Sequence, residues 1–161
     1  MKLYHGSNIL VSQPDIKKGK PFKDFGQGFY LSDSIEQAME MAERVAARVN
    51  VEQTPIVTTF EFDESVMTDG SLKVKSFETY TEEWAEFVLH NRDRKMPQPT
   101  HDYDIVYGPI ADDGVVRQMR RFELGDITLK ELMQELRYPP KITFQYFFGS
   151  KKALEKLIFI C

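Results

Sequence analysis

Hydrophobic and polar positions along the chain repeat with the period of a strand in some segments and with the period of a helix in others. Segments of the two kinds alternate along the sequence. A period of two over 55–62 predicts a strand whose buried face carries Ile56, Thr58, Phe60 and Phe62. Short apolar runs predict further strands at 2–5, 29–31, 104–107, 142–148 and 157–160. None of these runs is long enough to span a membrane.

Several of the segments between these strands show the periodicity of a helix. Helices are predicted to begin near Asp33, Glu82, Asp113 and Thr128, with a short fifth helix capped by Ser150. Strands therefore come singly or in short runs, with helices between and beside them. This pattern favours a mixed α+β fold, arranged as a single domain over residues 1–161.

Two of the predicted helices carry specific capping and packing signals. In the first, Asp33 and Glu36 are expected to form a capping box, and the predicted buried stripe is Ile35, Ala38, Ala42, Val45 and Val49. In the helix at Thr128, the expected capping partner is Glu131, and Pro139-Pro140 are expected to end the helix.

Composition narrows the class of protein. The chain has 161 residues, 42% hydrophobic and 29% charged, and a net charge of −4, which argues against a general nucleic-acid-binding surface. Two local basic clusters, best explained as solvated charge, comprise Lys17, Lys18, Lys20 and Lys23 in a loop and Arg117, Arg120 and Arg121 in a helix. A single cysteine excludes a disulfide framework, and no signal peptide is evident, so a cytoplasmic protein is expected.

Two glycine-containing segments near the start carry the strongest chemical signal. They are Leu3-Tyr4-His5-Gly6-Ser7 and Asp24-Phe25-Gly26-Gln27-Gly28-Phe29-Tyr30-Leu31-Ser32. Glycine lets a backbone approach a ligand closely, while His and Tyr supply a hydrogen bond and a flat face. The pair suggests a site for a planar, sugar-bearing molecule. It is no dinucleotide fingerprint, because a third glycine is absent and a strand follows directly.

The remaining candidate catalytic and metal-binding residues give weaker signals than these two segments. His5, His90 and His101 lie far apart without metal-ligand spacing, so no metal site is predicted, and Ser7 lacks the context of a hydrolase nucleophile. Asp112-Asp113 fits a helix cap better than a carboxylate facing a ligand. Gln145, in the middle of an apolar strand, either faces solvent or directs a hydrogen-bonding amide into a cleft.

Taken in order, these residues resemble the ADP-ribosyltransferase fold in its His-Tyr-Glu branch, which holds the diphtheria-toxin-like enzymes and the poly(ADP-ribose) polymerases. Tyr4-His5-Gly6-Ser7 matches the first motif, and the segment from Gly26 to Asp33 matches the second. The best candidate for the third position, a Glu in that branch, is Gln145. Over nearly its full length the chain also looks like a small bacterial family of unknown function assigned to this fold.

The resemblance implies a split β-sheet core with flanking helices and a site for NAD, used as a substrate without a metal. His5 would bond a ribose hydroxyl, the Gly6 backbone would pair with the nicotinamide amide, and Tyr30 would stack on the nicotinamide ring. The resemblance also assigns Gly28 to the cofactor site, with Ser7 or Ser32 adding a hydroxyl contact. Met41 and Ala38 would stand where polymerases carry an aromatic residue and a Ser.

The expected activity is mono-ADP-ribosyl transfer from NAD to an unidentified protein, nucleic acid or small molecule, with His5, Tyr30 and Gln145 as the catalytic set. Because Gln145 carries no charge, the rate would depend on geometry, on Tyr30 packing, or on another acid such as Asp112 or Asp113. NAD hydrolysis and NAD or ADP-ribose binding without turnover are the alternatives. Kinship further suggests the toxin of a toxin–antitoxin-like pair, with an antitoxin protein as partner.

Overall fold

A computed structural model describes residues 1–50, 52–137 and 142–161 of the chain. Over these residues the chain forms two β-sheets and five α-helices, which confirms the mixed α+β class. The predicted stop at Pro139-Pro140 lies outside the described residues. No helix in the described ranges is long and apolar enough to cross a membrane.

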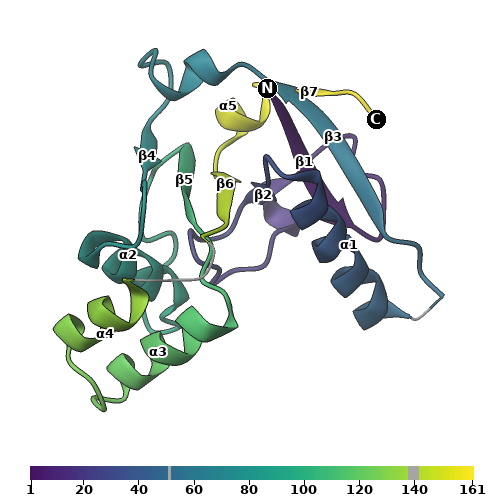
Figure 1. Ribbon diagram of the computed structural model, residues 1–161. Helices are drawn as coiled ribbons and strands as arrows, with labels where there is room; N and C mark the ends of the chain where they lie inside the picture. The colour runs from purple at the N-terminus through teal and green to yellow at the C-terminus, as the bar shows by residue number, and fades with distance from the viewer. Residues whose placement is uncertain (51, 138–141) are drawn as a thin grey trace.

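The strands are divided between two sheets (Figure 1). The smaller has the order β1-β3-β7, formed antiparallel by β1 (Lys2–Ser7), β3 (Ile56–Phe62) and β7 (Leu157–Phe159). The larger has the order β2-β6-β5-β4, formed by β2 (Phe29–Leu31), β6 (Phe144–Phe148), β5 (Ile105–Pro109) and β4 (Val74–Ser76). The sequence pattern missed β4, which pairs with β5 in parallel and is too short to show alternation.

A single bridge joins the two sheets at their adjoining edges. Tyr4 of β1 and Ser32, just after β2, exchange both backbone hydrogen bonds at 2.8 Å. Beyond this point no backbone hydrogen bond links β1 to β2 within the described residues. The two sheets are therefore continuous at one point and split on the side where His5 and Gly6 lie.

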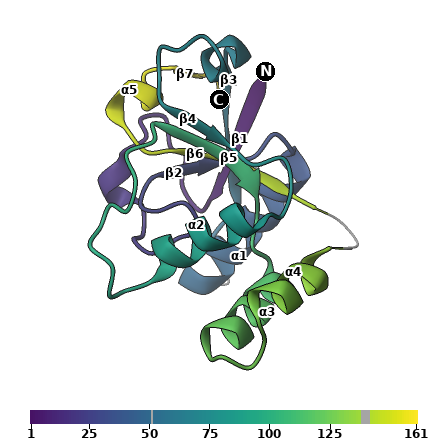
Figure 2. The ribbon, with the colours of Figure 1, turned by 90° about the vertical axis from the view of Figure 1, so that its left-hand side faces the viewer.

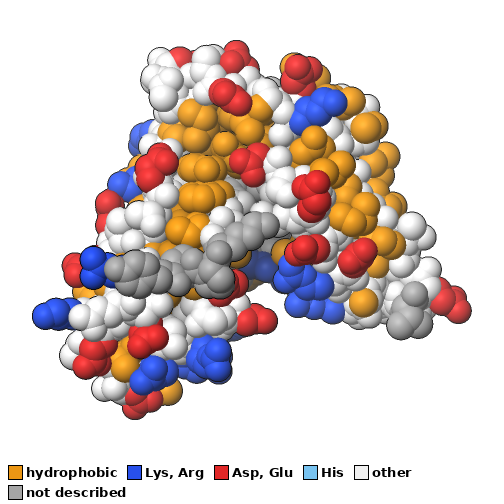
Figure 3. Space-filling model, in the orientation of Figure 1, with side chains coloured by type: hydrophobic (Ala, Val, Ile, Leu, Met, Phe, Trp, Pro, Cys, Tyr) orange, Lys and Arg blue, Asp and Glu red, His pale blue; other side chains and the backbone are white. Residues whose placement is uncertain are grey.

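The helices cover different parts of this framework (Figures 1 and 2). Helix α1 (Ile35–Val49) packs on β1, whereas α2 (Glu82–Arg92), α3 (Asp113–Glu123) and α4 (Leu129–Leu136) gather beside one end of the larger sheet. The short α5 (Lys151–Leu154) precedes β7. Figure 3 shows a deep notch between the part that holds α3 and α4 and the part that holds α1.

Helix α1 differs from its prediction in both its start and its buried face. Its N-cap is Ser34, whose side chain accepts a hydrogen bond from the Gln37 N–H, so the predicted cap at Asp33 is wrong. Helix α1 buries Ala38, Ala42 and Ala46. The predicted stripe residues Ile35 and Val49 are 47% and 61% exposed.

Close packing against β1 explains this choice of face. A Cβ atom placed on Gly6 would lie 1.9 Å from the Ala38 carbonyl oxygen, so the helix backbone rests directly on the glycine. Only small side chains fit between two backbones that approach this closely. The alanine line therefore faces the strand, and the larger apolar residues of α1 turn outward.

Two apolar clusters form the core. One lies between the larger sheet and helices α2–α4 and includes Trp84, Phe25, Val106, Leu132 and Phe147. The other is built on strands from both sheets and includes Leu3, Phe60, Ile105 and Phe148. The Thr128–Glu131 capping box of α4 and the Ser150 cap of α5 are both present, as predicted.

We expect Gly6→Ala to destabilise the protein by roughly 1–3 kcal/mol or more, because the new methyl group forces α1 away from β1. The free energy of urea unfolding measures the effect. Gly114→Ala is the matched control, since a Cβ there meets nothing closer than 3.4 Å. Equal stability of the two variants would contradict this account of the packing.

Candidate functional site

His5 occupies the point where the two sheets part. Its Nδ1 atom lies 2.8 Å from the carbonyl oxygen of Tyr30 in β2. The β1 residue next in register after the Tyr4–Ser32 bridge is Gly6, which would face Tyr30 if pairing continued. The imidazole satisfies the Tyr30 carbonyl in place of that backbone bond, and so keeps β1 and β2 apart.

This contact fixes the tautomer of His5. A carbonyl oxygen only accepts, so Nδ1 carries the proton and the Nε2 atom of the neutral ring is an acceptor. Burial lowers the pKa of His5 below its ordinary value, which favours the neutral form. Every buried side-chain nitrogen or oxygen of the described residues has a hydrogen-bond partner. The Nε2 atom of His5 has no such partner, so it is not buried and opens to the surface.

The main chain of Gly6 lies beside this imidazole. Peptide groups along an antiparallel strand alternate between its two edges. Because Tyr4 directs both of its groups to β2, Gly6 two residues later also directs its N–H and C=O toward that side. The adjacent Ser7 hydroxyl donates to the Asn8 side chain at 3.5 Å, a long contact that holds it weakly.

Tyr30 is held from both ends. Its hydroxyl donates to the Gly26 carbonyl at 2.7 Å and accepts from the Phe25 N–H at 3.1 Å, which closes the glycine-containing turn. Its ring packs edge-on against Phe147 at 5.3 Å, and burial raises the pKa of the phenol well above its ordinary value. Gly28 makes this packing possible, because a Cβ there would lie 2.3 Å from the Phe147 ring.

Gln145 lies on β6, next to β2, on the same sheet face as Tyr30. The register pairs Tyr30 with Phe147, and Gln145 comes two residues before Phe147. The Gln145 side-chain amide donates from Nε2 to the carboxylate of Asp24 at 3.3 Å. Because a carboxylate only accepts hydrogen bonds, the amide atom that faces Asp24 is the Nε2 donor. The Oε1 atom of Gln145 is then an acceptor without a partner among the described residues.

Asp24 is the functional candidate that the sequence analysis missed. Its carboxylate accepts from Gln145, from the Ala111 N–H at 3.1 Å and from the Arg92 guanidinium at 3.3 Å. Burial raises the pKa of Asp24, while these donors and the Arg92 charge oppose that rise. The available signal was an acid at the start of the glycine-containing segment, but its partner Gln145 is 121 positions away.

Several other predicted site residues have structural positions. Ser32 is buried, and its hydroxyl accepts from the Ser34 N–H at 3.0 Å. Asp112 caps α3 by accepting from the Val115 N–H at 2.9 Å, and Asp113 is exposed in the first turn of that helix. Gln145 forms a hydrogen bond with Asp24 and none with Asp112 or Asp113. Met41 is 43% exposed on α1, and Ala38 is buried against Gly6.

His101 contrasts with His5. Its Nε2 lies 2.6 Å from the Phe25 carbonyl, and its Nδ1 accepts from the Tyr103 N–H, so a neutral ring uses both nitrogens. His101 therefore fixes the loop that precedes Tyr30 and offers no atom to a ligand. Among the described residues no group of His, Cys, Asp and Glu could hold a metal ion.

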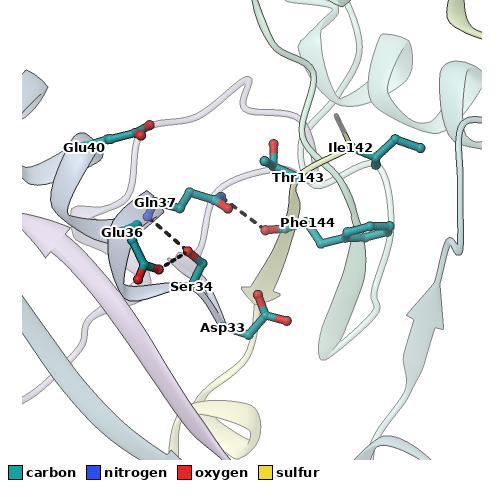
Figure 4. Close-up of a pocket in the computed structure, with 8 residues that line it drawn as sticks. All are labelled: Asp33, Ser34, Glu36, Gln37, Glu40, Ile142, Thr143 and Phe144. Carbon is teal, nitrogen blue, oxygen red and sulfur yellow. Dashed lines mark hydrogen bonds between the residues drawn. The ribbon is translucent and has the colours of Figure 1, made fainter. Parts of the chain in front are cut away.

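An acidic hollow of about 230 Å³ adjoins the site where α1 meets β6 (Figure 4). Its lining is Asp33, Ser34, Glu36, Gln37, Glu40, Ile142, Thr143 and Phe144. The Gln37 amide donates to the Phe144 carbonyl at 3.2 Å and ties the first turn of α1 to β6. Three carboxylates thus lie at the end of β6 that carries Gln145.

Comparison with known families gives one match. The family described as "Protein of unknown function (DUF3990)" matches residues 1–159, and the chain belongs to it. No curated protein matches the chain.

Acid should destabilise the protein through two half-buried imidazoles, those of His5 and His101. The pKa values of His5 and His101 are lowered from 6.5, so the unfolded chain takes up protons first as the pH falls. The contribution of these two residues to stability is therefore fully present above pH 6.5 and declines as the pH drops toward their folded-state pKa values. Urea unfolding at a series of pH values measures this decline.

His5→Asn isolates the share of His5, because the Asn amide can still donate to the Tyr30 carbonyl but does not titrate. We expect a shallower decline in this variant than in the wild type. His90→Asn, at an exposed position on α2, is the control and should leave the decline unchanged. Equal slopes for all three proteins would contradict the assigned role of His5.

Proposed function

For a chain whose family is described only as one of unknown function, we propose an activity from the site itself: NAD-dependent mono-ADP-ribosyl transfer, on an ADP-ribosyltransferase-like split-sheet core. The observation that carries the proposal is the His5–Tyr30 contact at the split between the sheets. It leaves the Nε2 atom of a neutral imidazole as an acceptor, next to the Gly6 main chain, which is directed toward β2, and next to Tyr30 on that neighbouring strand.

These groups complement the nicotinamide riboside half of NAD. The free Nε2 atom of His5 can accept a hydrogen bond from a ribose hydroxyl. The N–H and C=O of Gly6 match the acceptor and donor of a carboxamide, and the Tyr30 ring offers a flat face to the nicotinamide. The bonds of the Tyr30 hydroxyl to Gly26 and Phe25 fix the orientation of that ring before any ligand arrives.

The chemistry requires stabilisation of positive charge on the sugar. The bond from the anomeric carbon of the ribose to the nicotinamide nitrogen breaks, and its electron pair leaves with neutral nicotinamide. The acceptor nucleophile then bonds to that carbon and releases its proton. The developing charge resembles that of glycoside cleavage, where a nearby negative group lowers the barrier.

Asp24 and Gln145 supply this negative group together in our proposal. Asp24 accepts from the Gln145 amide nitrogen and so polarises the amide and turns its oxygen outward. The outward oxygen accepts from a ribose hydroxyl, while the buried carboxylate provides the field. A Glu at position 145 would set a second carboxylate against Asp24, which explains why Gln stands there.

Two other outcomes are separable from transfer. Water in place of the acceptor makes the protein an NAD glycohydrolase, which releases nicotinamide without labelling any acceptor. The uncharged Gln145 favours the remaining candidate, a module that binds NAD without turnover. Calorimetry with NAD and a nicotinamide-release assay identify a module that binds without turnover, and label on an acceptor distinguishes a transferase from a glycohydrolase.

The first test incubates the protein with labelled NAD and a cell lysate. We expect label on an acceptor and release of nicotinamide. His5→Asn should keep the Tyr30 contact, lose the Nε2 acceptor and reduce the rate about tenfold or more. Tyr30→Ala should abolish activity by removing the stacking face. His90→Asn is the matched control and should retain wild-type activity; no transfer and no nicotinamide release by the wild type would refute the proposal.

A second test exchanges the charge between two positions. Gln145→Glu alone should gain little activity, because the new acid and Asp24 share one proton. Asp24→Asn alone should lower the rate by removing the buried charge. The double variant Asp24→Asn/Gln145→Glu restores one carboxylate and should exceed both single variants. A Gln145→Glu variant that alone surpasses the wild type would show that Asp24 does not supply the charge.

A further inference from the structure

A second hollow, of about 300 Å³, lies between the end of α2 and one face of α3. We call it the arginine pocket; it is lined by Phe22, Leu89, Arg92, Arg94, Val116, Met119, Arg120 and Glu123. Its lining thus combines three guanidinium groups, one carboxylate and several apolar side chains. Arg120 is exposed, which agrees with its interpretation as solvated charge, and it also lines this hollow.

The guanidinium groups of the pocket are under-neutralised. Arg92 bonds the Asp24 carboxylate at 3.3 Å, and Asp24 shares that carboxylate with two other donors. Arg94 and Arg120 form no ion pair and no side-chain hydrogen bond with any described residue. Positive charge therefore remains in excess here, although the whole chain carries −4.

The loop before Asp24 adds to this excess. The pKa of the Lys23 ammonium is lowered first by burial and then by the charge of Lys20; the Asp24 carboxylate opposes this, and Arg48 and Arg92 lower the pKa further. These cations come from a loop, from α1 and from α2, so they converge in space from separate parts of the sequence. Asp24 is the acid among these neighbours, so the cations outnumber the acid, as is typical of an anion-binding surface.

Phe22 lines the arginine pocket with an aromatic ring and has an uncommon backbone conformation. Its φ angle is +60°, in the left-handed region that residues other than glycine rarely adopt. The side chain contacts Arg94, whose guanidinium carbon lies 5.2 Å from the ring centre. The strained backbone thus presents an aromatic face that orients an otherwise unpaired arginine.

We propose that the arginine pocket binds a phosphate-bearing ligand, a phosphate monoester or a diphosphate. Guanidinium groups recognise phosphate oxygens through paired, charge-assisted hydrogen bonds, and two of the three arginines are unbonded. Leu89, Val116 and Met119 add apolar side chains to a lining that is otherwise mostly polar. The volume suits a phosphorylated small group and is at the lower end for a ligand pocket.

The arginine pocket is connected to the candidate site through one carboxylate. Arg92 and Gln145 bond the same Asp24 side chain, one on each oxygen. The phosphate source is either the diphosphate of the NAD donor or a phosphate of the acceptor. This last step rests on the proposed function, whereas anion binding by the pocket does not.

Calorimetric titration of the full chain with inorganic pyrophosphate at low salt tests the pocket directly. We expect binding that weakens about fivefold or more in Arg94→Gln and in Arg120→Gln. Arg121→Gln is the matched control, because it is next on α3, bonds Gln118 and does not line the pocket. Unchanged thermal unfolding midpoints show that these surface variants remain folded.

Two results would overturn the proposal: no binding of pyrophosphate to the wild type, or Arg94→Gln and Arg120→Gln binding as tightly as Arg121→Gln. Competition between ADP-ribose and pyrophosphate identifies the donor diphosphate as the source. Simultaneous binding of both identifies an acceptor phosphate, and either result supports the pocket. Since pyrophosphate binding needs no turnover, an inactive protein with an intact arginine pocket would refute the proposed function alone.

Discussion

The hydrogen bond from the His5 imidazole to the Tyr30 carbonyl is the contact on which the candidate site depends. It occupies the position where β1 and β2 would otherwise continue to pair, and it fixes the tautomer that leaves Nε2 as an acceptor. The same contact leaves the main chain of Gly6 directed toward the split. One side chain thus separates two strands, satisfies the Tyr30 carbonyl and leaves Nε2 as a free acceptor beside the Gly6 main chain.

This arrangement requires a rigid surrounding, and the glycine-containing segments supply it. Gly6 lets α1 rest on β1, and Gly28 admits the Phe147 ring that supports Tyr30. His101 uses both of its nitrogens to hold the loop before Tyr30. The glycines that suggested a cradle for a ligand therefore act first on packing between protein segments, and the site follows from that packing.

The sequence predicted elements with a strong local signal and failed where distant residues decide. Alternation over 55–62 and the Thr128–Glu131 capping box were confirmed. The buried face of α1 was wrong, because the close approach to Gly6 selects alanine over larger apolar residues. Strand β4 was missed, since three residues carry no periodicity. The Asp24–Gln145 contact depends on how the chain folds, which no local pattern reports.

Charge is distributed around the site in a way that matches the polarity of the proposed substrate. The acidic hollow with Asp33, Glu36 and Glu40 lies at one end of β6, and NAD carries its positive charge on the nicotinamide ring. Arg92 at the arginine pocket reaches the same strand through Asp24, and NAD carries its negative charge on the diphosphate. Between them, His5 is favoured in its neutral form and Gln145 carries no charge, so in the proposed complex neither pole of NAD would meet a like charge at the ribose. A buried carboxylate beside a neutral amide preserves this gradient, whereas an exposed acid at position 145 would also attract cations that compete with the substrate.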